Sequence, residues 1–234
     1  MADKITIMRD GTTVETLEKG KDVFSEERII KGMVGREMVD RYPKRDGDYV
    51  GDVVMEVKDW ECCNPKYEDH KVVKGVSFHV NKGEVLGICG LMGAGRTELA
   101  MSIFGESYGV NIKGELKIHG KKVRLHSPKE AIKHGLAYVT EDRKGNGIIL
   151  SSSIKHNTSL ANLKGISHMG IIDVDKEAQV AKEYVLKLKT KCPNVEQFTG
   201  NLSGGNQQKV LLSKWMFTNP EIFILDEPTR GIDV

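Results

Sequence analysis

Residues 90–97 constrain this chain more than any other stretch, because they read Gly-Leu-Met-Gly-Ala-Gly-Arg-Thr. The apolar residues 84–89 before them predict a buried strand, and residues 98–104 after them predict a helix that ends at Gly105. A glycine-rich loop between a strand and a helix is suited to binding phosphate, because free backbone N–H groups and the helix N-terminus both attract an anion. We therefore expect a phosphate-binding loop, with Thr97 placed to reach Mg²⁺.

The loop departs from the usual G-x-x-x-x-G-K-[ST] motif at one position, where Arg96 stands in place of lysine. Lysine is a compact charge on a flexible stem, whereas arginine is a wide planar fork, so the fit to the terminal phosphates differs. Taken alone, the loop is a weak signal, and a structural glycine turn between a strand and a helix explains it about equally well.

A second group of candidates lies near the end of the sequence. Residues 221–225 are apolar and predict a strand, which is followed directly by Asp226 and Glu227. Ligands of open α/β sheets gather at the carboxyl ends of the strands, and adjacent carboxylates there are suited to metal binding and base catalysis. The alternative is a solvated turn, which the following Pro-Thr-Arg-Gly-Ile-Asp sequence at 228–233 makes less favourable.

A serine-glycine turn forms a third candidate. Residues 202–209 read Leu-Ser-Gly-Gly-Asn-Gln-Gln-Lys and lead into an amphipathic helix at 210–217. Ser203 is expected to cap that helix, with free loop amides near its N-terminus. The turn is therefore a second anion-binding helix end in the same chain.

The composition suits a soluble globular protein, since 39% of the 234 residues are hydrophobic and 29% are charged. The formal net charge of +2 gives no argument for nucleic-acid binding, and no apolar run is long enough to cross a membrane. The cysteines and the scattered histidines follow no metal-binding spacing, so we expect reduced structural thiols, with Cys89 in a core strand.

The first part of the chain is predicted to be separate from the rest. Residues 4–18 predict a β-hairpin, because an Asp-Gly turn lies between two β-prone runs. Residues 25–35 predict a short helix that begins after a serine cap. Residues 36–51 have the charge, proline and glycine content of a linker, and a new domain is expected to begin near Asp52.

The remaining elements are predicted from apolar periodicity and turn residues. They are strands at 53–60, 71–80 and 136–139, a hairpin within 114–125, and a helix that opens at Ser127-Pro128. Residues 153–190 carry mostly helical signals, and we expect a helical subdomain, over about residues 150–218, inserted between two strands of an α/β sheet.

Together these motifs resemble the ATP-binding cassette (ABC) family of transport ATPases. Residues 202–208 resemble its signature motif, residues 222–227 its Walker B strand, and residues 228–233 its D-loop. Residues 90–97 resemble a Walker A loop with arginine for lysine, and Tyr67 resembles the aromatic residue that stacks on adenine. The resemblance implies an α/β fold of the P-loop NTPase class, with a mixed sheet core, an antiparallel β subdomain and an inserted helical subdomain.

Four stretches, at residues 90–99, 139–144, 202–209 and 226–234, resemble the second cassette of bacterial monosaccharide importers, of the xylose or multiple-monosaccharide type. Their ATPase subunits carry two cassettes in one chain. Residues 33–37 resemble the connector between the two cassettes. The resemblance implies that residues 1–18 are the last hairpin of the first cassette and that residues 19–51 are a linker with a short helix. Residues 52–234 would be an incomplete second nucleotide-binding domain.

The resemblance also implies a role for individual residues, with ATP and Mg²⁺ as cofactors. Glu227 would be the catalytic residue, and the metal would be held by Thr97, Glu141 and Asp226. Ser203 to Gly205 would cover ATP that is bound by the first cassette, because two cassettes of this family face each other head to tail. The residues implied to bind nucleotide are Tyr67, Gly90, Leu91, Met92, Gly93, Ala94, Gly95, Arg96, Thr97, Glu98, Ser203, Gly204, Gly205 and Gln207.

The implied function is that of an ABC-type monosaccharide-transporting ATPase, peripheral to the cytoplasmic face of the plasma membrane. Its implied partners are the first cassette of the same subunit, the transmembrane permease subunits and, indirectly, a sugar-binding protein, with no nucleic acid. The isolated chain is expected to hydrolyse ATP poorly, because of Arg96 and the absence of its partner cassette. Two alternatives stay open: a regulatory module that binds nucleotide without hydrolysing it, and a soluble cassette ATPase of translation or repair.

Overall fold

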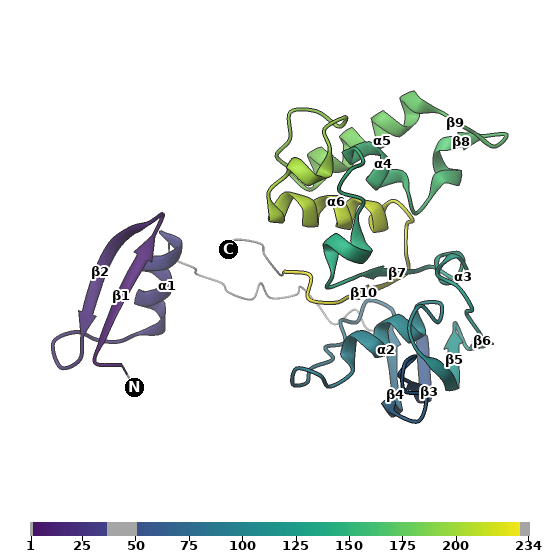
Figure 1. Ribbon diagram of the computed structural model, residues 1–234, viewed down its shortest axis with the longest axis horizontal. Helices are drawn as coiled ribbons and strands as arrows, with labels where there is room; N and C mark the ends of the chain where they lie inside the picture. The colour runs from purple at the N-terminus through teal and green to yellow at the C-terminus, as the bar shows by residue number, and fades with distance from the viewer. Residues whose placement is uncertain (1, 37–50, 230–234) are drawn as a thin grey trace. The chain divides into compact units, whose positions relative to one another are not determined.

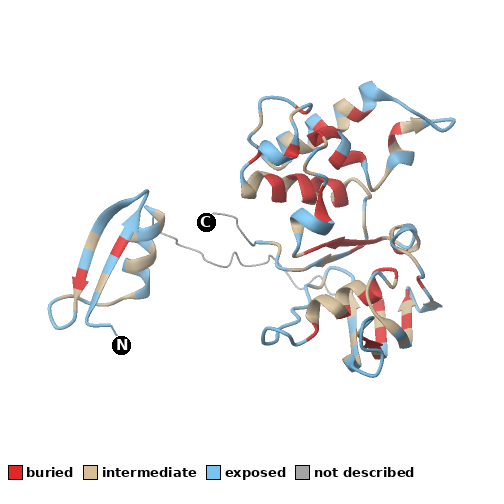
Figure 2. Ribbon diagram, viewed as in Figure 1, coloured by how far each residue is buried: buried red, intermediate tan, exposed pale blue. Residues whose placement is uncertain are grey.

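A computed structural model of the chain describes residues 2–36 and 51–229 (Figure 1). The chain divides into two compact units, and of the described residues 2–36 belong to the first unit and 51–229 to the second. Each unit has its own buried side chains, which are red in Figure 2. Residues 37–50 of the predicted linker and residues 230–233 of the predicted D-loop lie outside the described residues.

The first unit is a β-hairpin covered by a helix. Its elements are β1 (Lys4–Arg9), β2 (Thr12–Glu18) and α1 (Glu26–Val34). The turn residues Asp10 and Gly11 both have positive φ, as a two-residue turn between twisted antiparallel strands requires. Helix α1 packs so closely on β1 that a Cβ added to Gly32 would lie 2.9 Å from Ile7 Cγ2. The predicted hairpin and helix are therefore confirmed as elements of the structure.

The second unit contains a four-stranded antiparallel sheet in the order β4-β3-β5-β6. Its strands are β3 (Val53–Cys63), β4 (Lys71–Asn81), β5 (Val110–Ile118) and β6 (Lys121–Val123). Alternate residues of β3 and β5, such as Met55, Val57 and Leu116, are buried on one face. Trp60 also lies inside, where its indole N–H donates to Ser102 Oγ at 3.0 Å. The predicted strands and hairpin of this region are confirmed.

A pair of parallel strands delivers the acidic residues. Strand β7 (Leu136–Val139) is buried at all four residues and pairs in register with β10 (Ile222–Leu225). Helix α6 (Gly204–Met216) runs alongside this pair in Figure 1 and buries Leu211 and Trp215 in the same core. The predicted strands before and after the helical region are therefore confirmed, and β10 ends directly before Asp226.

Two helices begin where the sequence predicts them. Helix α2 (Arg96–Ile103) follows the glycine-rich loop. Helix α3 (Pro128–Lys133) begins after Ser127, whose Oγ accepts a hydrogen bond from the Glu130 backbone N–H at 3.3 Å. Proline suits the first position of α3, because its fixed φ is helical and the helix needs no N–H there.

The region between β7 and α6 is mostly helical, as predicted. Its elements are η1 (Arg143–Gly147), α4 (Ile154–Ser159), η2 (Leu163–Ile166), β8 (Ser167–His168), β9 (Ile171–Ile172), α5 (Val174–Lys187) and η3 (Thr199–Asn201). A separate small core of Ile154, Leu202 and Val210 holds α4 against α6. The short β8–β9 hairpin was not predicted, because two residues in each strand are too few to show a period.

The expected buried strand at residues 84–89 is wrong. This stretch has no regular secondary structure, the side chain of Val85 is 77% exposed, and Cys89 is exposed rather than in the core. A strand is stable only when a neighbour satisfies its backbone N–H and C=O groups. Among residues 51–229 no strand pairs with this stretch, so its β-prone residues do not form a strand.

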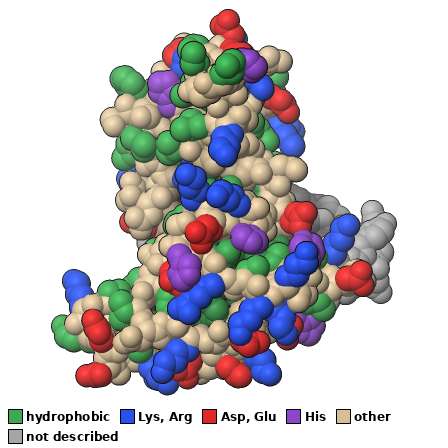
Figure 3. All heavy atoms as spheres, turned by 90° about the vertical axis from the view of Figure 1, so that its right-hand side faces the viewer, with side chains coloured by type: hydrophobic (Ala, Val, Ile, Leu, Met, Phe, Trp, Pro, Cys, Tyr) green, Lys and Arg blue, Asp and Glu red, His purple; other side chains and the backbone are tan. Residues whose placement is uncertain are grey.

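The charged side chains of the second unit are spread rather than concentrated. On the face shown in Figure 3, lysine and arginine side chains are interspersed with aspartate and glutamate. No helix within the described parts of the chain has both the length and the apolar character needed to cross a bilayer.

Candidate nucleotide-binding site

The backbone of the glycine-rich loop has a conformation that only glycine tolerates well. Gly93 and Gly95 have φ of +81° and +86°, in the left-handed region. A Cβ on Gly95 would also lie 2.7 Å from the carbonyl oxygen of Val72 on β4. Gly95 is the residue directly before α2, so this close approach fixes where the N-terminus of the helix begins. Its free N–H groups and positive end are what an anionic phosphate would meet.

The loop and the acidic strand end meet in space although they are 129 positions apart in sequence. Thr97 Oγ1, in the first turn of α2, donates a hydrogen bond to Asp226 Oδ2 at 2.8 Å. The backbone N–H of Asp226 donates to Val139 O at 2.9 Å, which continues the β7–β10 ladder one residue beyond the strand. The carboxylate is therefore held by the sheet on one side and by the helix on the other.

Arg96 lies next to the second carboxylate of the strand end. Its Nη2 atom is 4.0 Å from Glu227 Oε1, and both side chains are partly exposed, at 37% and 49%. An exposed pair at this distance contributes little to stability. Glu227 has a backbone φ of +47°, which is uncommon for a residue other than glycine. Such backbone strain is often found at functional sites.

Tyr138 is a member of this cluster that the sequence did not indicate. Its hydroxyl donates to Asp226 Oδ2 at 3.1 Å, and the residue is only 5% exposed. Burial raises the pKa of Tyr138, and the nearby charge of Asp226 raises it further, so the hydroxyl stays a neutral donor. From the sequence, Tyr138 is only one residue of a predicted buried strand. No sequence motif identifies a tyrosine whose hydroxyl contacts a carboxylate at the end of the neighbouring strand.

The cluster offers hard oxygen ligands of the kind that Mg²⁺ prefers. Thr97 supplies a hydroxyl and Asp226 a carboxylate, while Glu141 lies close enough to Tyr138 for its charge to add to the raised pKa of that residue. Among the described residues no group of three histidine, cysteine or acidic side chains could enclose a metal ion. This donor set fits Mg²⁺, because that ion is commonly bound by one or two protein oxygens together with the phosphates of a substrate.

The serine-glycine turn is built differently from the prediction. Ser203 does occupy the N-cap position of α6, but its Oγ accepts from Asn206 Nδ2 at 2.9 Å and caps no backbone N–H. A Cβ on Gly205 would meet nothing within 4 Å, so the fold of this chain does not require glycine there. Within residues 51–229, no hydrogen bond or ion pair joins the turn to the cluster around Asp226.

Gln207 and Tyr67, two of the predicted nucleotide contacts, lie in contrasting surroundings. Gln207 is 5% exposed, and its side-chain N–H groups donate to the carbonyl oxygens of Thr199 and Leu202. It therefore holds the turn from inside rather than facing solvent. Tyr67 is 70% exposed in the turn between β3 and β4, where an aromatic ring is open to stack on a planar ligand.

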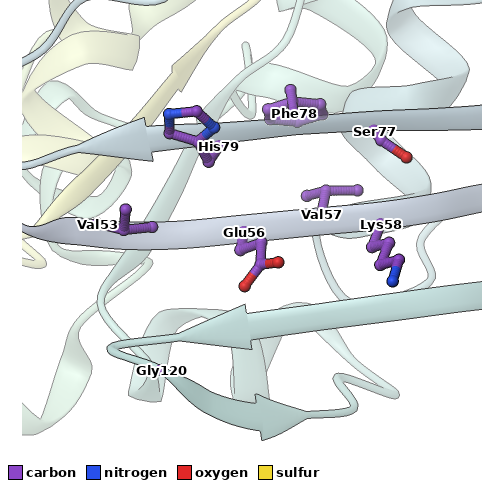
Figure 4. Close-up of a pocket in the computed structure, with 8 residues that line it drawn as sticks. All are labelled: Val53, Glu56, Val57, Lys58, Ser77, Phe78, His79 and Gly120. Atoms are coloured by element: carbon purple, nitrogen blue, oxygen red, sulfur yellow. The ribbon is translucent and has the colours of Figure 1, made fainter.

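One cavity of the second unit is lined by none of the residues of this cluster. It has a volume of about 550 Å³ and is lined by residues of β3 and β4 and by Gly120, among them Glu56 and His79 (Figure 4). None of its lining residues belongs to the predicted site. We assign it no function, because the chemistry-bearing residues of the chain gather elsewhere.

Comparison with known proteins gives the same motifs a wider context. A family model described as "ABC transporter" matches residues 73–230. The chain is 51% identical to the L-arabinose transport ATP-binding protein AraG of Geobacillus stearothermophilus and 45% identical to the ribose import ATP-binding protein RbsA of Bacillus subtilis. Both alignments cover the whole chain but only 45% of the relative. The chain thus spans about half the length of the curated relatives it matches.

Solved structures share the fold at lower sequence identity. A nucleotide-free ATP-binding cassette from an ABC transporter superposes with a TM-score of 0.61 at 21% identity, over 75% of this chain and 69% of the other. The cbiO1 protein of Clostridium perfringens, part of the ABC transporter complex cbiONQ, gives 0.58 at 21% identity, over 78% and 68%. At this level of identity the likeness concerns the fold alone.

Proposed function

Because the chain belongs to the ABC transporter family, we propose that it is part of the ATP-binding subunit of a monosaccharide importer, in which ATP binding and hydrolysis drive a membrane permease. Membership of this family implies ATP binding and an α/β cassette of the P-loop NTPase fold. The observation that carries the proposal is the meeting of Thr97 with Asp226 beside a glycine-rich loop.

The loop would hold the phosphates of ATP. The N–H groups of residues 90–97 and the N-terminus of α2 supply positive partial charge, and Arg96 adds a full charge beside them. Tyr67 would stack on adenine from the exposed turn between β3 and β4. Glu98 lies in the first turn of α2 and would help to position this end of the helix.

Thr97 and Asp226 would hold Mg²⁺, with Glu141 contributing from the loop after β7. The ion, when bound, neutralises charge that develops on the phosphates. Glu227 would orient the attacking water and accept its proton, and Arg96 lies near enough to bias the direction of that carboxylate. Phosphoryl transfer needs mainly positioning and charge neutralisation, which these residues can provide together.

The serine-glycine turn would serve a second nucleotide. Ser203, Gly204 and Gly205 stand at the N-terminus of α6, and within residues 51–229 no hydrogen bond or ion pair joins them to the cluster at Asp226. The turn is left open in this chain, which supports the proposal that it covers ATP held by another cassette of the same subunit. Closing two cassettes on ATP is a domain motion that can be passed to a permease.

The relatives of the chain support a proposal for its cargo and for its place in the cell. The arabinose, xylose and ribose proteins that it resembles suggest a monosaccharide, and their printed names describe import or transport proteins. We propose that the protein binds peripherally to the cytoplasmic face of the plasma membrane, through permease subunits. In this proposal residues 1–18 end a first cassette, residues 19–51 link the two, and residues 52–234 belong to the second.

The test is ATP-dependent sugar uptake by the intact protein, reconstituted with its permease in vesicles. We expect uptake that requires ATP and Mg²⁺, and loss of uptake when Asp226 is changed to Asn. The matched control is Asp173→Asn, which alters a helix cap on α5 outside the cluster. Uptake that survives Asp226→Asn, or an intact protein that binds no ATP, would contradict the proposal.

A further inference from the structure

Two hydroxyl groups converge on one oxygen atom of Asp226. Thr97 Oγ1 and Tyr138 OH both donate to Oδ2, at 2.8 and 3.1 Å. The side-chain hydrogen bonds that Asp226 receives within the described residues thus all go to Oδ2, and the other oxygen, Oδ1, has none. A carboxylate held in this way has a defined plane and keeps one oxygen available.

The two donors come from different elements, and they differ in burial. Thr97 belongs to the helix that starts at the glycine-rich loop, whereas Tyr138 belongs to the buried strand β7. The ring of Tyr138 packs against Phe104 with the ring centroids 5.6 Å apart, and Phe104 packs in turn on Trp215 of α6 at 5.4 Å. The Tyr138 hydroxyl is therefore placed by core packing that involves β7, Phe104 at the C-terminal end of α2, and Trp215 of α6.

We propose that Tyr138 is a positioning residue for metal binding: its hydroxyl holds Oδ2 of Asp226 so that Oδ1 stays available for Mg²⁺ or for a water that the ion holds. The proposal rests on the proposed function, in which Asp226 is a metal ligand. Thr97 would bind the metal through an oxygen lone pair, so its hydroxyl geometry must adjust when the ion arrives. Tyr138 has no such second task, and it keeps the carboxylate oriented before and after metal binding.

The role predicts a defect in metal affinity rather than in nucleotide affinity. Groups that orient a metal ligand change metal affinity by about 10–100-fold when they are removed. Tyr138 lies among core residues on β7 and is not part of the loop that would hold the phosphates. Loss of its hydroxyl should therefore leave metal-free nucleotide binding unchanged.

The experiment compares Tyr138→Phe with wild type in the intact protein, using Mn²⁺ as a paramagnetic probe. We expect Mn²⁺ affinity in the presence of ADP, measured by electron paramagnetic resonance, to fall about tenfold. ADP affinity in EDTA, measured by calorimetry, should change by less than about twofold. The matched control is Tyr184→Phe, a half-buried tyrosine on α5 that packs on Phe217 in the helical region.

Three results would overturn the role. One is equal Mn²⁺ affinity in Tyr138→Phe and wild type. Another is a fall in the metal-free ADP affinity of Tyr138→Phe that is as large as the fall in its Mn²⁺ affinity. The third comes from 3-fluorotyrosine at position 138, which keeps the ring and the hydroxyl and should bind Mn²⁺ like wild type. If the fluorinated protein loses as much as the Phe variant, packing rather than the hydrogen bond is responsible. A wild-type protein that binds no ADP at all would instead overturn the proposed function, and this role with it.

Discussion

The two glycine-containing turns of this protein look alike in sequence and are built in different ways. Gly95 is locked into its place by a positive φ and by the carbonyl oxygen of Val72, and the helix after it meets Asp226. Gly205 has open space where a side chain would be, and Ser203 beside it caps nothing. The first turn is therefore stabilised by contacts within this chain. The second turn has open space beside Gly205.

The largest expected effect tests whether the first turn belongs to a catalytic site. We expect Glu227→Gln in the intact protein to slow ATP hydrolysis by at least about 100-fold, because the water then loses its base, while ATP binding persists. Hydrolysis is measured by phosphate release and binding by calorimetry. Glu221→Gln is the control, since Glu221 is exposed and its ion pair with His119 lies at the start of β10. Wild-type rates in Glu227→Gln would break the assignment of this turn.

A pair of alanine substitutions tests the comparison directly. Gly95→Ala should lower the free energy of unfolding by about 2–3 kcal/mol, because its φ is positive and its Cβ would collide with a backbone oxygen. Gly205→Ala should leave stability unchanged or raise it by up to about 1 kcal/mol, because alanine favours helix and meets no neighbour. Urea unfolding of both variants measures this. The two turns would be equivalent if both variants lost the same stability.

Gly205→Ala has a second use as a probe of the open turn. The variant should hydrolyse ATP more slowly than wild type, because the added methyl group stands where the second nucleotide is proposed to approach. Its stability should be no lower than that of wild type. Unchanged hydrolysis with unchanged stability would remove the reason for assigning a nucleotide to this turn.

Lys214 joins α6, the helix that begins at the serine-glycine turn, to η1 after β7. It lies on α6, is 6% exposed, and donates from Nζ to the carbonyl oxygen of Gly147, in the loop that follows β7 and Glu141. Burial lowers the pKa of Lys214 to about 8, from a usual value near 10.5 in the unfolded chain. Between these values the unfolded state binds more protons than the folded state, so the free energy of unfolding rises with pH.

We therefore expect wild type to gain up to about 2 kcal/mol of stability between pH 8 and pH 9.5 relative to Lys214→Met, which has no group to titrate there. Parallel urea unfolding at the two pH values measures the difference, and groups shared by both proteins cancel. A difference that stays constant with pH would mean that the ammonium is not desolvated by this contact.

The smallest expected effect concerns the unusual arginine. Arg96→Lys should tighten ATP binding by no more than about fivefold, because a compact charge suits the terminal phosphates and the exposed contact with Glu227 that is lost is worth less than about 1 kcal/mol. Calorimetry with ATP and Mg²⁺ measures the change. Unchanged affinity would show that the arginine fits the loop as well as lysine does.

Much of the fold could be predicted because its signals are local. The Asp-Gly hairpin, the capped helix after Ser127 and the strand before Asp226 each depend on a few neighbouring residues, and each is confirmed. The stretch at 84–89 failed for the opposite reason. Its apolar, β-prone residues describe a strand, but a strand also needs a neighbour, and local composition carries no information about whether one is present.

The candidate site shows the same division. The glycine-rich loop and the acidic pair were visible as motifs, and the family resemblance implied that Thr97 and Asp226 hold one metal ion. Tyr138 and the inward side chain of Gln207 were not visible, since a tyrosine in a buried strand and a glutamine in a polar turn have ordinary local explanations.

The sequence by itself determined local features: where the turns lie, that a glycine-rich loop precedes α2, and which strand ends in carboxylates. These depend on φ preferences, capping and periodicity, which act over a few residues. Only the tertiary structure decided that two hydroxyls meet Asp226 on one oxygen, that Lys214 is buried against Gly147, and that the serine-glycine turn is left open. Such contacts depend on strand register and packing between distant segments, and no local pattern encodes them.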